Sequence, residues 1–313
     1  MSNWKILLTD GLEENGKTIL AVEAQVDDRK NISAEELLKV IGEYDAVIVR
    51  GRTKVSREVL ASGKKLKVVG RSGVGVDNID IQAAKERQVT VVNAPVATTR
   101  AVAELVIGMM FCLAREIPRA DRSLKQNQWL KKELEGVELE GKTLGIIGTG
   151  HIGSSVAKMA GALGMKILAF DPVLAPEAIH AAGGEACNLD ELLQKSDFIT
   201  IHTPLNDSTR RMIDSERLSK MKKGVRIICA ARGNIIDETA LLSALNSGQV
   251  AGAALDVFSV EPPQDSELVK HPHIIATPHI GGQTVEAQIR AANDISHEVL
   301  AALHGEPLRW KVA

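Results

Sequence analysis

A glycine-rich segment in the middle of the chain has the residue types needed to bind a pyrophosphate. It reads Gly148-Thr149-Gly150-His151-Ile152-Gly153, follows a short apolar run and precedes a segment of helical pattern. Spaced glycines let a backbone turn tightly and approach a pyrophosphate, whose charge lies at the N-terminus of the following helix. A strand–helix turn without a ligand can carry the same glycines, but the flanking elements favour a dinucleotide site. The expected cofactor contacts are Gly148, Gly150, His151, Ile152 and Gly153.

An acidic residue follows the next apolar strand and discriminates between nucleotide cofactors. Asp171 can accept hydrogen bonds from the ribose hydroxyls of adenosine. A 2′-phosphate beside this carboxylate would meet a repulsion of roughly 1–4 kcal/mol. No Lys or Arg lies between Asp171 and Lys195 to offset that repulsion. The sequence therefore predicts NAD rather than NADP as the cofactor.

Three further polar side chains stand near the ends of apolar strands in the second half of the chain. They are Arg232, Glu261 and His279, a guanidinium, a carboxylate and an imidazole. Open α/β sheets place their ligands at the carboxyl ends of the strands, so these positions suit a catalytic site. Each of the three, taken alone, is explained as well by an ordinary exposed loop residue. Together they favour catalysis.

The elements that must hold these residues alternate between short apolar strands and helix-length segments, the pattern of parallel βαβ units. A capping box, Ser33-x-x-Glu36, and an N-cap, Asp237, mark two of the helices, the second over 238–246. The two series of strands indicate an α/β fold with two domains that join near Pro95. The strands are expected at 5–9, 46–50, 67–70, 90–93, 143–147, 166–170, 198–202, 226–229, 252–257 and 274–277.

Composition and charge exclude several classes of protein. The 313 residues include 38 Lys and Arg against 40 Asp and Glu, and this balance argues against nucleic acid or an anionic membrane as a partner. The apolar stretch from Val102 to Ala114 contains Glu104 and is too short to span a bilayer, so we expect a buried helix. Three cysteines without CxxC spacing, and a start without a signal-peptide pattern, predict a cytoplasmic protein with no metal site.

Several longer motifs occur in one order along nearly the whole chain. By this set the chain resembles the D-isomer-specific 2-hydroxyacid dehydrogenases. The resemblance implies an NAD-dependent oxidoreductase with two Rossmann-like or flavodoxin-like domains, each built on a parallel sheet. The motifs are the glycine-rich segment, Arg71-Ser72-Gly73-Val74-Gly75-Val76-Asp77-Asn78, Val102-Ala103-Glu104-Leu105, His202-Thr203-Pro204-Leu205, Ala254-Leu255-Asp256-Val257-Phe258 and Thr277-Pro278-His279-Ile280-Gly281-Gly282.

The resemblance also implies roles for the polar residues at the strand ends. His279 would protonate the oxygen of a 2-keto acid as hydride arrives, and would remove that proton in the reverse direction. Glu261 would orient the imidazole and stabilise its cationic form, and Arg232 would hold the substrate carboxylate with its fixed fork of donors. The other side of that carboxylate would be bound by backbone amides of Gly73, Val74 and Gly75.

The same resemblance implies how the cofactor and the domains are arranged. Asp256 would bind the nicotinamide carboxamide, and further cofactor contacts would come from Thr203, Ala230 and Gly281. The substrate-binding domain would be discontinuous, made from 1–95 and 283–313, with the NAD-binding domain over 96–282. The active site would lie in the cleft between the domains, where closure excludes water. We expect no C-terminal regulatory domain in the sequence, which stops at Ala313.

Within the family, the chain is most similar to members that act on 3-phosphoglycerate and 3-phosphohydroxypyruvate in serine biosynthesis. A second anion on the substrate requires cations, and the resemblance points to Arg50, Arg71 and Lys131, the last reaching across the interface of a homodimer. The alternatives are strand-end salt bridges for the two arginines and plain exposure for the lysine. Thr98 stands where such members carry an Asn that contacts substrate. This departure leaves open another acid, with a sulfonated or uncharged tail.

Two other functions are compatible with the resemblance. The C-terminal-binding-protein corepressors share the fold and sense NAD, and they can retain residues equivalent to Arg232, Glu261 and His279. A formate-type dehydrogenase would carry Gln in place of Glu261, which argues against that activity. The candidate anion-binding residues favour a dehydrogenase of small 2-hydroxy acids. A peptide pull-down set against a turnover assay distinguishes a corepressor from an enzyme.

Overall fold

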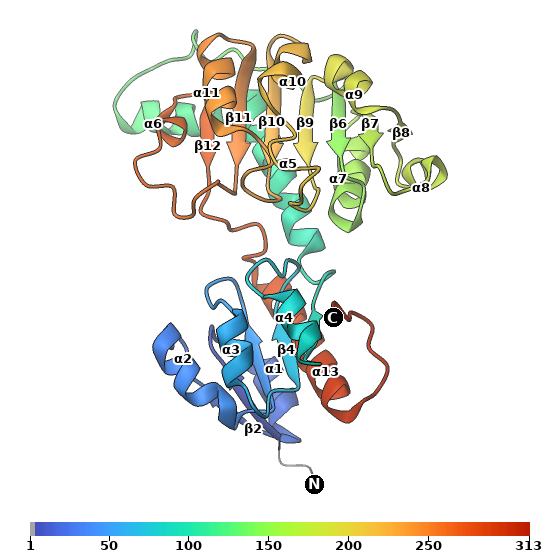
Figure 1. The fold of residues 1–313 in the computed structure, drawn as a ribbon. Coiled ribbons are helices and arrows are strands. Elements are labelled where there is room, and N and C mark those ends of the chain that lie inside the picture. Colours follow the sequence, from blue (N-terminus) through green and yellow to red (C-terminus); the bar gives the residue numbers. More distant parts are fainter. Residues whose placement is uncertain (1–3) are drawn as a thin grey trace. The chain divides into compact units, whose positions relative to one another are not determined.

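A computed structural model describes residues 4–313, and the chain folds as two compact units. Unit 1 comprises Met1–Thr98 with Gly282–Ala313, and unit 2 comprises Thr99–Gly281. Each unit contains one parallel sheet with helices packed against it (Figure 1). The sequence start without a signal-peptide pattern falls partly on residues 1–3, which lie outside the described residues.

Unit 1 is built on a five-stranded parallel sheet of order β2-β1-β3-β4-β5. This is the flavodoxin-like order of a doubly wound sheet. Alternate residues of each strand enter two separate cores: Ile6 and Leu8 face one core, and Leu7 faces the other. The strands are β1 (Trp4–Leu8), β2 (Ala24–Asp28), β3 (Ala46–Val49), β4 (Val68–Arg71) and β5 (Thr90–Asn93).

The last helix of the chain returns to unit 1 and completes one of these cores. Helix α13 (Val285–His304) packs beside α1 (Glu14–Ala21) and places Ile295 and Val299 against the sheet. A Cβ on Gly70 of β4 would lie 2.6 Å from Val299 Cγ2, so the glycine lets α13 approach the sheet closely. The remaining elements of the unit are α2 (Ala34–Val40), η1 (Ile41–Glu43), α3 (Arg57–Ser62) and α4 (Ile81–Glu86).

Unit 2 has a seven-stranded parallel sheet of order β12-β11-β10-β9-β6-β7-β8. The order reverses between β6 and β9, which makes the carboxyl ends of these two strands the switch point where doubly wound sheets bind nucleotides. The strands are β6 (Thr143–Ile147), β7 (Lys166–Phe170), β8 (Glu185–Ala186), β9 (Phe198–Ile201), β10 (Val225–Cys229), β11 (Val250–Leu255) and β12 (Ile274–Ala276).

Helices cover both faces of this sheet. One core contains residues of α5 (Thr99–Arg115), α7 (His151–Ala162) and α8 (Pro176–Ala181). The other core contains residues of α9 (Leu189–Lys195), α10 (Ser215–Lys220), α11 (Glu238–Asn246) and α12 (Glu267–Lys270). The remaining helix of the unit, α6 (Ile117–Lys125), follows α5 along the chain. The apolar stretch in α5 is helical and buried along one face, as predicted, whereas Phe111 within it is exposed. Within residues 4–313, no helix has the length and apolar character that a membrane crossing requires.

The predicted α/β fold with parallel sheets is confirmed, and several local predictions agree with it in detail. Both expected caps are present: Ser33 and Glu36 form the reciprocal capping box, and Asp237 accepts hydrogen bonds at the start of α11. The prediction of a strand over 252–257 is wrong at both ends, since β11 spans Val250–Leu255. Strands β2 and β8 were not predicted; both lie at sheet edges, where one neighbour and partial exposure permit polar residues.

Candidate active site

The glycine-rich turn joins β6 to α7 at the switch point of the larger sheet. Gly148 has a φ of +91°, and a Cβ there would lie 2.9 Å from the carbonyl carbon of His202. A Cβ on Gly153 would lie 2.0 Å from the Gly148 oxygen, so only glycine lets α7 pack this closely on the turn. A Cβ on Gly150 would meet nothing within 4 Å. The N-terminus of α7 is therefore open to the close approach of an anion such as a pyrophosphate.

Other candidate cofactor residues surround this turn. Thr203 lies just past β9, and a Cβ on Gly148 would be 3.0 Å from its Cγ2. The Thr203 hydroxyl is buried and has no hydrogen-bond partner within residues 4–313. A buried hydroxyl of this kind is unfavourable unless a ligand supplies a partner, so it fits a cofactor-binding role. Ala230 is half-buried after β10, Ile152 is half-buried on α7, and His151 beside it is exposed.

His202 lies between β9 and Thr203, and its imidazole is neutral at physiological pH. Burial lowers the pKa of His202 to about 4. The Nε2 atom lies 2.9 Å from the Thr200 hydroxyl. A histidine with so low a pKa is unsuited to donate a proton near neutral pH.

Asp171 closes the other side of the glycine turn. One carboxylate oxygen accepts the Thr149 N–H at 2.8 Å, and the other accepts the amides of Val173 and Leu174 at 2.9 and 3.2 Å. Burial alone would raise the pKa of Asp171, but these backbone hydrogen bonds outweigh it, and the pKa is lowered. The side chain thus carries a negative charge at neutral pH beside the turn.

This charge predicts the cofactor preference. We expect kcat/KM with NADH to exceed that with NADPH by roughly tenfold or more, because the 2′-phosphate would lie beside the Asp171 carboxylate. Asp171→Asn should narrow the preference, since the amide keeps one acceptor oxygen for the backbone and loses the charge. Initial rates with both cofactors at one pH measure the ratio. Equal or better use of NADPH by the unmodified protein would contradict the prediction.

Glu261 and His279 form a hydrogen-bonded pair at the carboxyl edge of the same sheet. His279 Nδ1 lies 2.8 Å from Glu261 Oε2, and the Phe258 N–H donates to Glu261 Oε1 at 3.1 Å. The imidazole is 50% exposed, which leaves it open to a ligand. A histidine whose Nδ1 is held by a carboxylate presents Nε2 for proton transfer. The structure brings these two predicted residues together.

Asp256 holds the backbone around His279 in place. Its buried carboxylate accepts the Thr277 hydroxyl at 2.6 Å and the N–H groups of Ile280 and Gly281 at 2.8 and 2.7 Å. His279 itself has a φ of +53°, in the left-handed region that few side chains adopt. The expected contact of Asp256 with a nicotinamide carboxamide stays a prediction, and its observed contacts position the loop that carries His279. Gly281 is a buried part of the same loop.

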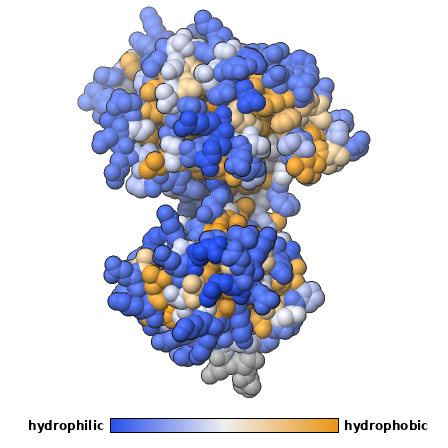
Figure 2. Space-filling view, in the orientation of Figure 1, coloured by the Kyte–Doolittle hydropathy of each residue, from blue (hydrophilic) through white to orange (hydrophobic). Residues whose placement is uncertain are grey.

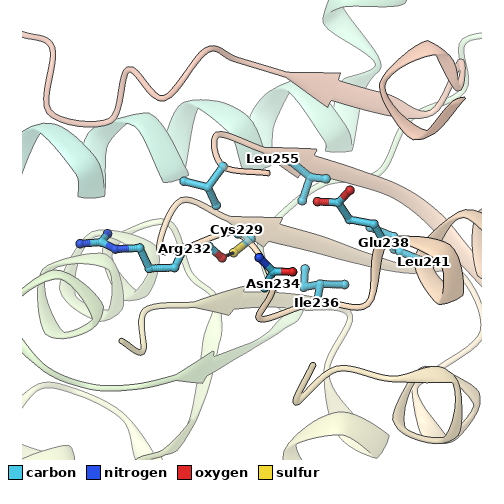
Figure 3. Close-up of a pocket in the computed structure, with 9 residues that line it drawn as sticks. Cys229, Arg232, Asn234, Ile236, Glu238, Leu241 and Leu255 are labelled. Carbon is cyan, nitrogen blue, oxygen red and sulfur yellow. Dashed lines mark hydrogen bonds between the residues drawn. The ribbon is translucent and has the colours of Figure 1, made fainter. Parts of the chain in front are cut away.

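Arg232 lies in the turn that follows β10, so Arg232, Glu261 and His279 follow three adjacent strands, β10, β11 and β12. Arg232 Nη1 donates to the Ala231 oxygen at 2.7 Å. Figure 3 shows its guanidinium directed away from Leu255 and the small pocket that lies behind the turn. Burial raises the pKa of Cys229 in that pocket to about 11, which favours the thiol form near neutral pH.

The predicted carboxylate-binding loop of unit 1 follows β4. Gly73 is buried with a φ of +143°, and a Cβ there would lie 1.5 Å from Arg71 Nη1. The Arg71 guanidinium, which donates to the Ser72 oxygen at 3.0 Å, thus covers Gly73. Val74 and Gly75 are half-buried, and the Asn93 amide donates to the Val74 oxygen at 2.6 Å. The Gly73 N–H donates to the Arg71 oxygen at 2.8 Å, so the donors that this loop presents for a carboxylate are the amides of Val74 and Gly75 and the nearby guanidinium.

Arg50 follows β3, next to β4 in the same sheet, and Val49 is paired with Arg71. Its backbone N–H donates to Asp10 at 2.7 Å, and its Nη2 is hydrogen-bonded to Gln288 of α13. The structure thus places Arg50 and Arg71 at the carboxyl ends of neighbouring strands. A strand-end salt bridge, the alternative for Arg50, is found instead at Arg52, whose Nη2 lies 2.9 Å from Asp10.

Lys131 belongs to unit 2, in the exposed segment that follows α6. Many hydrophilic side chains cover the face of the molecule shown in Figure 2, so an exposed lysine is not distinctive by itself. Thr98 is buried in unit 1, and a Cβ on Gly282 would lie 3.0 Å from its methyl carbon. Thr98, which stands in place of the expected Asn, therefore packs against Gly282, where the chain returns to unit 1.

Sequence reasoning missed three side chains that position the site of unit 1. They are Asp10, Asn93 and Gln288, which hold the Arg50 backbone, the Val74 carbonyl and the Arg50 side chain. Asp10 and Asn93 lie at or just past the carboxyl ends of β1 and β5, a signal that could have identified them. Gln288 comes from the other end of the chain, so no local pattern connects it with Arg50.

Comparisons with known proteins agree with this geometry. The family described as "D-isomer specific 2-hydroxyacid dehydrogenase, NAD binding domain" matches residues 107–281. A D-3-phosphoglycerate dehydrogenase of Synechocystis sp. is 44% identical over 98% of this chain, and the chain spans 56% of that protein.

Two solved structures extend the similarity to the three-dimensional fold. The structure of a glyoxylate reductase from Paecilomyes thermophila is 32% identical with a TM-score of 0.91, over 100% of this chain and 99% of that one. The structure of a D-lactate dehydrogenase from Aquifex aeolicus, complexed with NAD and lactic acid, is 30% identical with a TM-score of 0.84, over 96% of each chain.

Proposed function

Because this chain belongs to the D-isomer-specific 2-hydroxyacid dehydrogenase family, we propose that it is an NAD-dependent oxidoreductase acting at C2 of a D-2-hydroxy acid. The proposed substrate pair is 3-phosphoglycerate and 3-phosphohydroxypyruvate, the chemistry of serine biosynthesis. The observation that carries the proposal is the Glu261–His279 pair, an oriented acid–base group at the ligand-binding edge of a nucleotide-binding sheet.

The residues around the glycine turn fit NAD. When bound, NAD supplies the hydride acceptor or donor for the reaction. The open space at Gly150 and the N-terminus of α7 would hold the pyrophosphate, Asp171 the adenosine ribose, and the unpartnered Thr203 hydroxyl a polar group of the cofactor. Gly148, Ile152, Gly153 and His151 complete the turn, and Ala230, Asp256 and Gly281 lie after the neighbouring strands.

The chain's own residues supply the proton and hold the substrate. In reduction, His279 Nε2 donates a proton to the keto oxygen, and Glu261 stabilises the imidazolium before the proton leaves. In oxidation the imidazole accepts the hydroxyl proton. Arg232 binds the substrate carboxylate and polarises the carbonyl, a role suited to the donor fork of a guanidinium. Gly73, Val74 and Gly75 would supply backbone donors for the same carboxylate, the Gly73 amide by giving up its bond to the Arg71 oxygen.

A panel of 2-keto acids with NADH at fixed pH tests the function. We expect turnover of 3-phosphohydroxypyruvate above that of pyruvate, glyoxylate and 3-sulfopyruvate, because Arg50, Arg71 and Lys131 offer cations for a phosphate tail. Preference for the sulfonate or an uncharged tail would support a 2-hydroxyacid dehydrogenase and overturn the assignment of 3-phosphoglycerate as its substrate. No turnover, together with capture of a peptide ligand, would favour an NAD-sensing corepressor.

We also infer a cytoplasmic homodimer. Four large apolar side chains of α5, α6 and the segment after them are exposed, and an aqueous surface disfavours such a cluster along one stretch of chain. A second copy of this chain would cover them and bring Lys131 close to the interface. The balanced charge gives no sign of a nucleic-acid or membrane partner, and the three unpaired cysteines suit a reducing compartment. The four residues are Phe111, Ile117, Leu124 and Trp129.

The dimer is tested by sedimentation equilibrium. We expect a mass of about twice that of the chain, and Trp129→Glu should shift the population to monomer, because a carboxylate would be buried without a partner. Val173→Glu is the matched control, since Val173 is also highly exposed but lies outside this stretch of chain. A monomeric unmodified protein at micromolar concentration would contradict the prediction.

A further inference from the structure

A second glutamate approaches the loop that supports Glu261 and His279. Glu238 is the first residue of α11, and its Oε1 accepts the Ser259 N–H at 2.5 Å. The preceding amide, that of Phe258, donates to Glu261. Successive amides of one segment therefore bind two carboxylates, one of which orients the imidazole of His279.

The turn that carries Arg232 contacts the same peptide group. A Cβ on Gly233 would lie 1.8 Å from the Phe258 oxygen, so only glycine permits this approach. The Asn234 amide donates to the Ser259 oxygen at 3.3 Å, and Asn234 has a φ of +62°, which Asn tolerates better than most residues. The segment 258–259 is thus held by residues 233, 234 and 238.

The surroundings of Glu238 explain why its hydrogen bond is important. Glu238 lines a pocket together with Arg232, Gly233 and Asn234 and with apolar side chains, namely Cys229, Ile236, Leu241, Leu255 and Val257. Figure 3 shows the Glu238 carboxylate close to Leu255, on the side of the pocket away from the Arg232 guanidinium. Glu238 is half-buried, and its carboxylate accepts a charge-assisted bond from the Ser259 amide, which is stronger than a bond between neutral groups. This bond fixes both the carboxylate and the backbone that it holds.

We propose that Glu238 is a positioning residue for proton transfer in this enzyme. By binding the Ser259 amide it keeps the Phe258 amide directed at Glu261, and so keeps His279 oriented relative to the turn of Arg232. The inference rests on the proposed dehydrogenase function and extends it to a residue outside the acid–base pair. Glu238 acts through Glu261, with no contact to the reacting atoms.

Two neutral substitutions of similar size test the hydrogen bond itself. Glu238→Gln keeps an acceptor oxygen for the Ser259 amide, whereas Glu238→Met keeps the length of the side chain and fits the apolar pocket without an acceptor. We expect Glu238→Met to lower kcat about tenfold with KM for NADH unchanged, because a small misplacement of a catalytic group costs rate. Glu238→Gln should stay within about twofold of the unmodified enzyme. Equal activity of the two variants would overturn the proposal.

A double-mutant cycle shows whether Glu238 acts through Glu261. In a Glu261→Gln background, Glu238→Met should cause no further loss of kcat, because the group that it positions is already impaired. A full additional tenfold loss would show an independent, merely structural effect and would overturn the proposal. Glu216→Ala is the control: Glu216 is also in the first turn of a helix, and its ion pair with Lys220 is exposed.

If Glu238→Met fails to fold, a variant of Asn234 tests the same proposal. Asn234→Gly permits the same positive φ and removes the amide that binds Ser259. It should lower kcat severalfold, with no further loss in the Glu261→Gln background; unchanged kcat would overturn the proposal. If the unmodified protein reduces no 2-keto acid, the proposed function fails; if His279→Asn is fully active, another group supplies the proton. If the unmodified protein is active, His279→Asn is impaired and Glu238→Met matches Glu238→Gln, only this inference fails.

Discussion

Replacing His279 should lower kcat by about 10²–10⁴-fold, the usual contribution of a positioned acid–base group. The imidazole is the group held by Glu261 at 2.8 Å, and it is half exposed. His279→Asn is the preferred variant, because Asn tolerates the φ of +53° at this position better than Ala does. The Asn amide can still donate to Glu261, but it cannot supply a proton to the keto oxygen.

The measurement combines steady-state reduction of 3-phosphohydroxypyruvate with the NADH dissociation constant. NADH binding should stay near that of the unmodified protein, because the glycine turn and Asp171 lie after other strands, β6 and β7. His180→Ala serves as the control, since His180 is an exposed residue of α8. Full activity of His279→Asn would show that another group supplies the proton.

Removing Arg50 or Arg71 should impair the phosphorylated substrate more than pyruvate. Hydrogen bonds to charged groups contribute roughly 1.5–3 kcal/mol each, so the loss in kcat/KM for 3-phosphohydroxypyruvate should be about tenfold to a hundredfold. Arg50→Ala should discriminate more cleanly than Arg71→Ala, because the Arg71 guanidinium also covers Gly73, where the substrate carboxylate is proposed to bind. Lys131→Ala should act in the same direction more weakly, since an exposed lysine is well solvated.

The comparison of two keto acids in each variant separates tail binding from other effects. Arg52→Ala should reduce both activities alike, because Arg52 binds the Thr9 and Ile32 carbonyls and the Asp10 carboxylate and so supports the loop. Arg57→Ala should leave both unchanged, because its ion pairs are exposed. Losses of equal size on both acids in Arg50→Ala and Arg71→Ala would show that these cations hold the carboxylate or the fold.

The sequence predicted best where local chemistry decides the structure. The glycine turn at Gly148–Gly153 follows from close contacts that only glycine permits, and Asp237 caps α11 by a side-chain hydrogen bond within one turn. Strands with two neighbours are apolar on both faces and were found readily. Strand β2 contains Gln25, Asp27 and Asp28 and pairs only with β1, so its pattern did not differ from that of a loop.

Long-range contacts were the part that local patterns could not predict. Helix α13 reaches β4 through Val299 against Gly70, and Gln288 reaches Arg50, although more than two hundred residues separate each pair in sequence. The family resemblance, rather than periodicity, led to the expected return of the chain. Glu238 was missed for a related reason: a first-turn glutamate is common at helix N-termini, and only the fold shows that it holds Ser259.

The three hydrogen bonds that Asp256 accepts determine when the loop around His279 loses its conformational entropy. Fixing one residue of backbone costs about 1–2 kcal/mol at 25 °C. Because the Thr277 hydroxyl and the amides of Ile280 and Gly281 are bound within unit 2, the loop is ordered when the unit folds. In the proposed reaction, substrate would therefore meet a histidine that is already preorganised, and its binding free energy would not be reduced by the ordering of this loop.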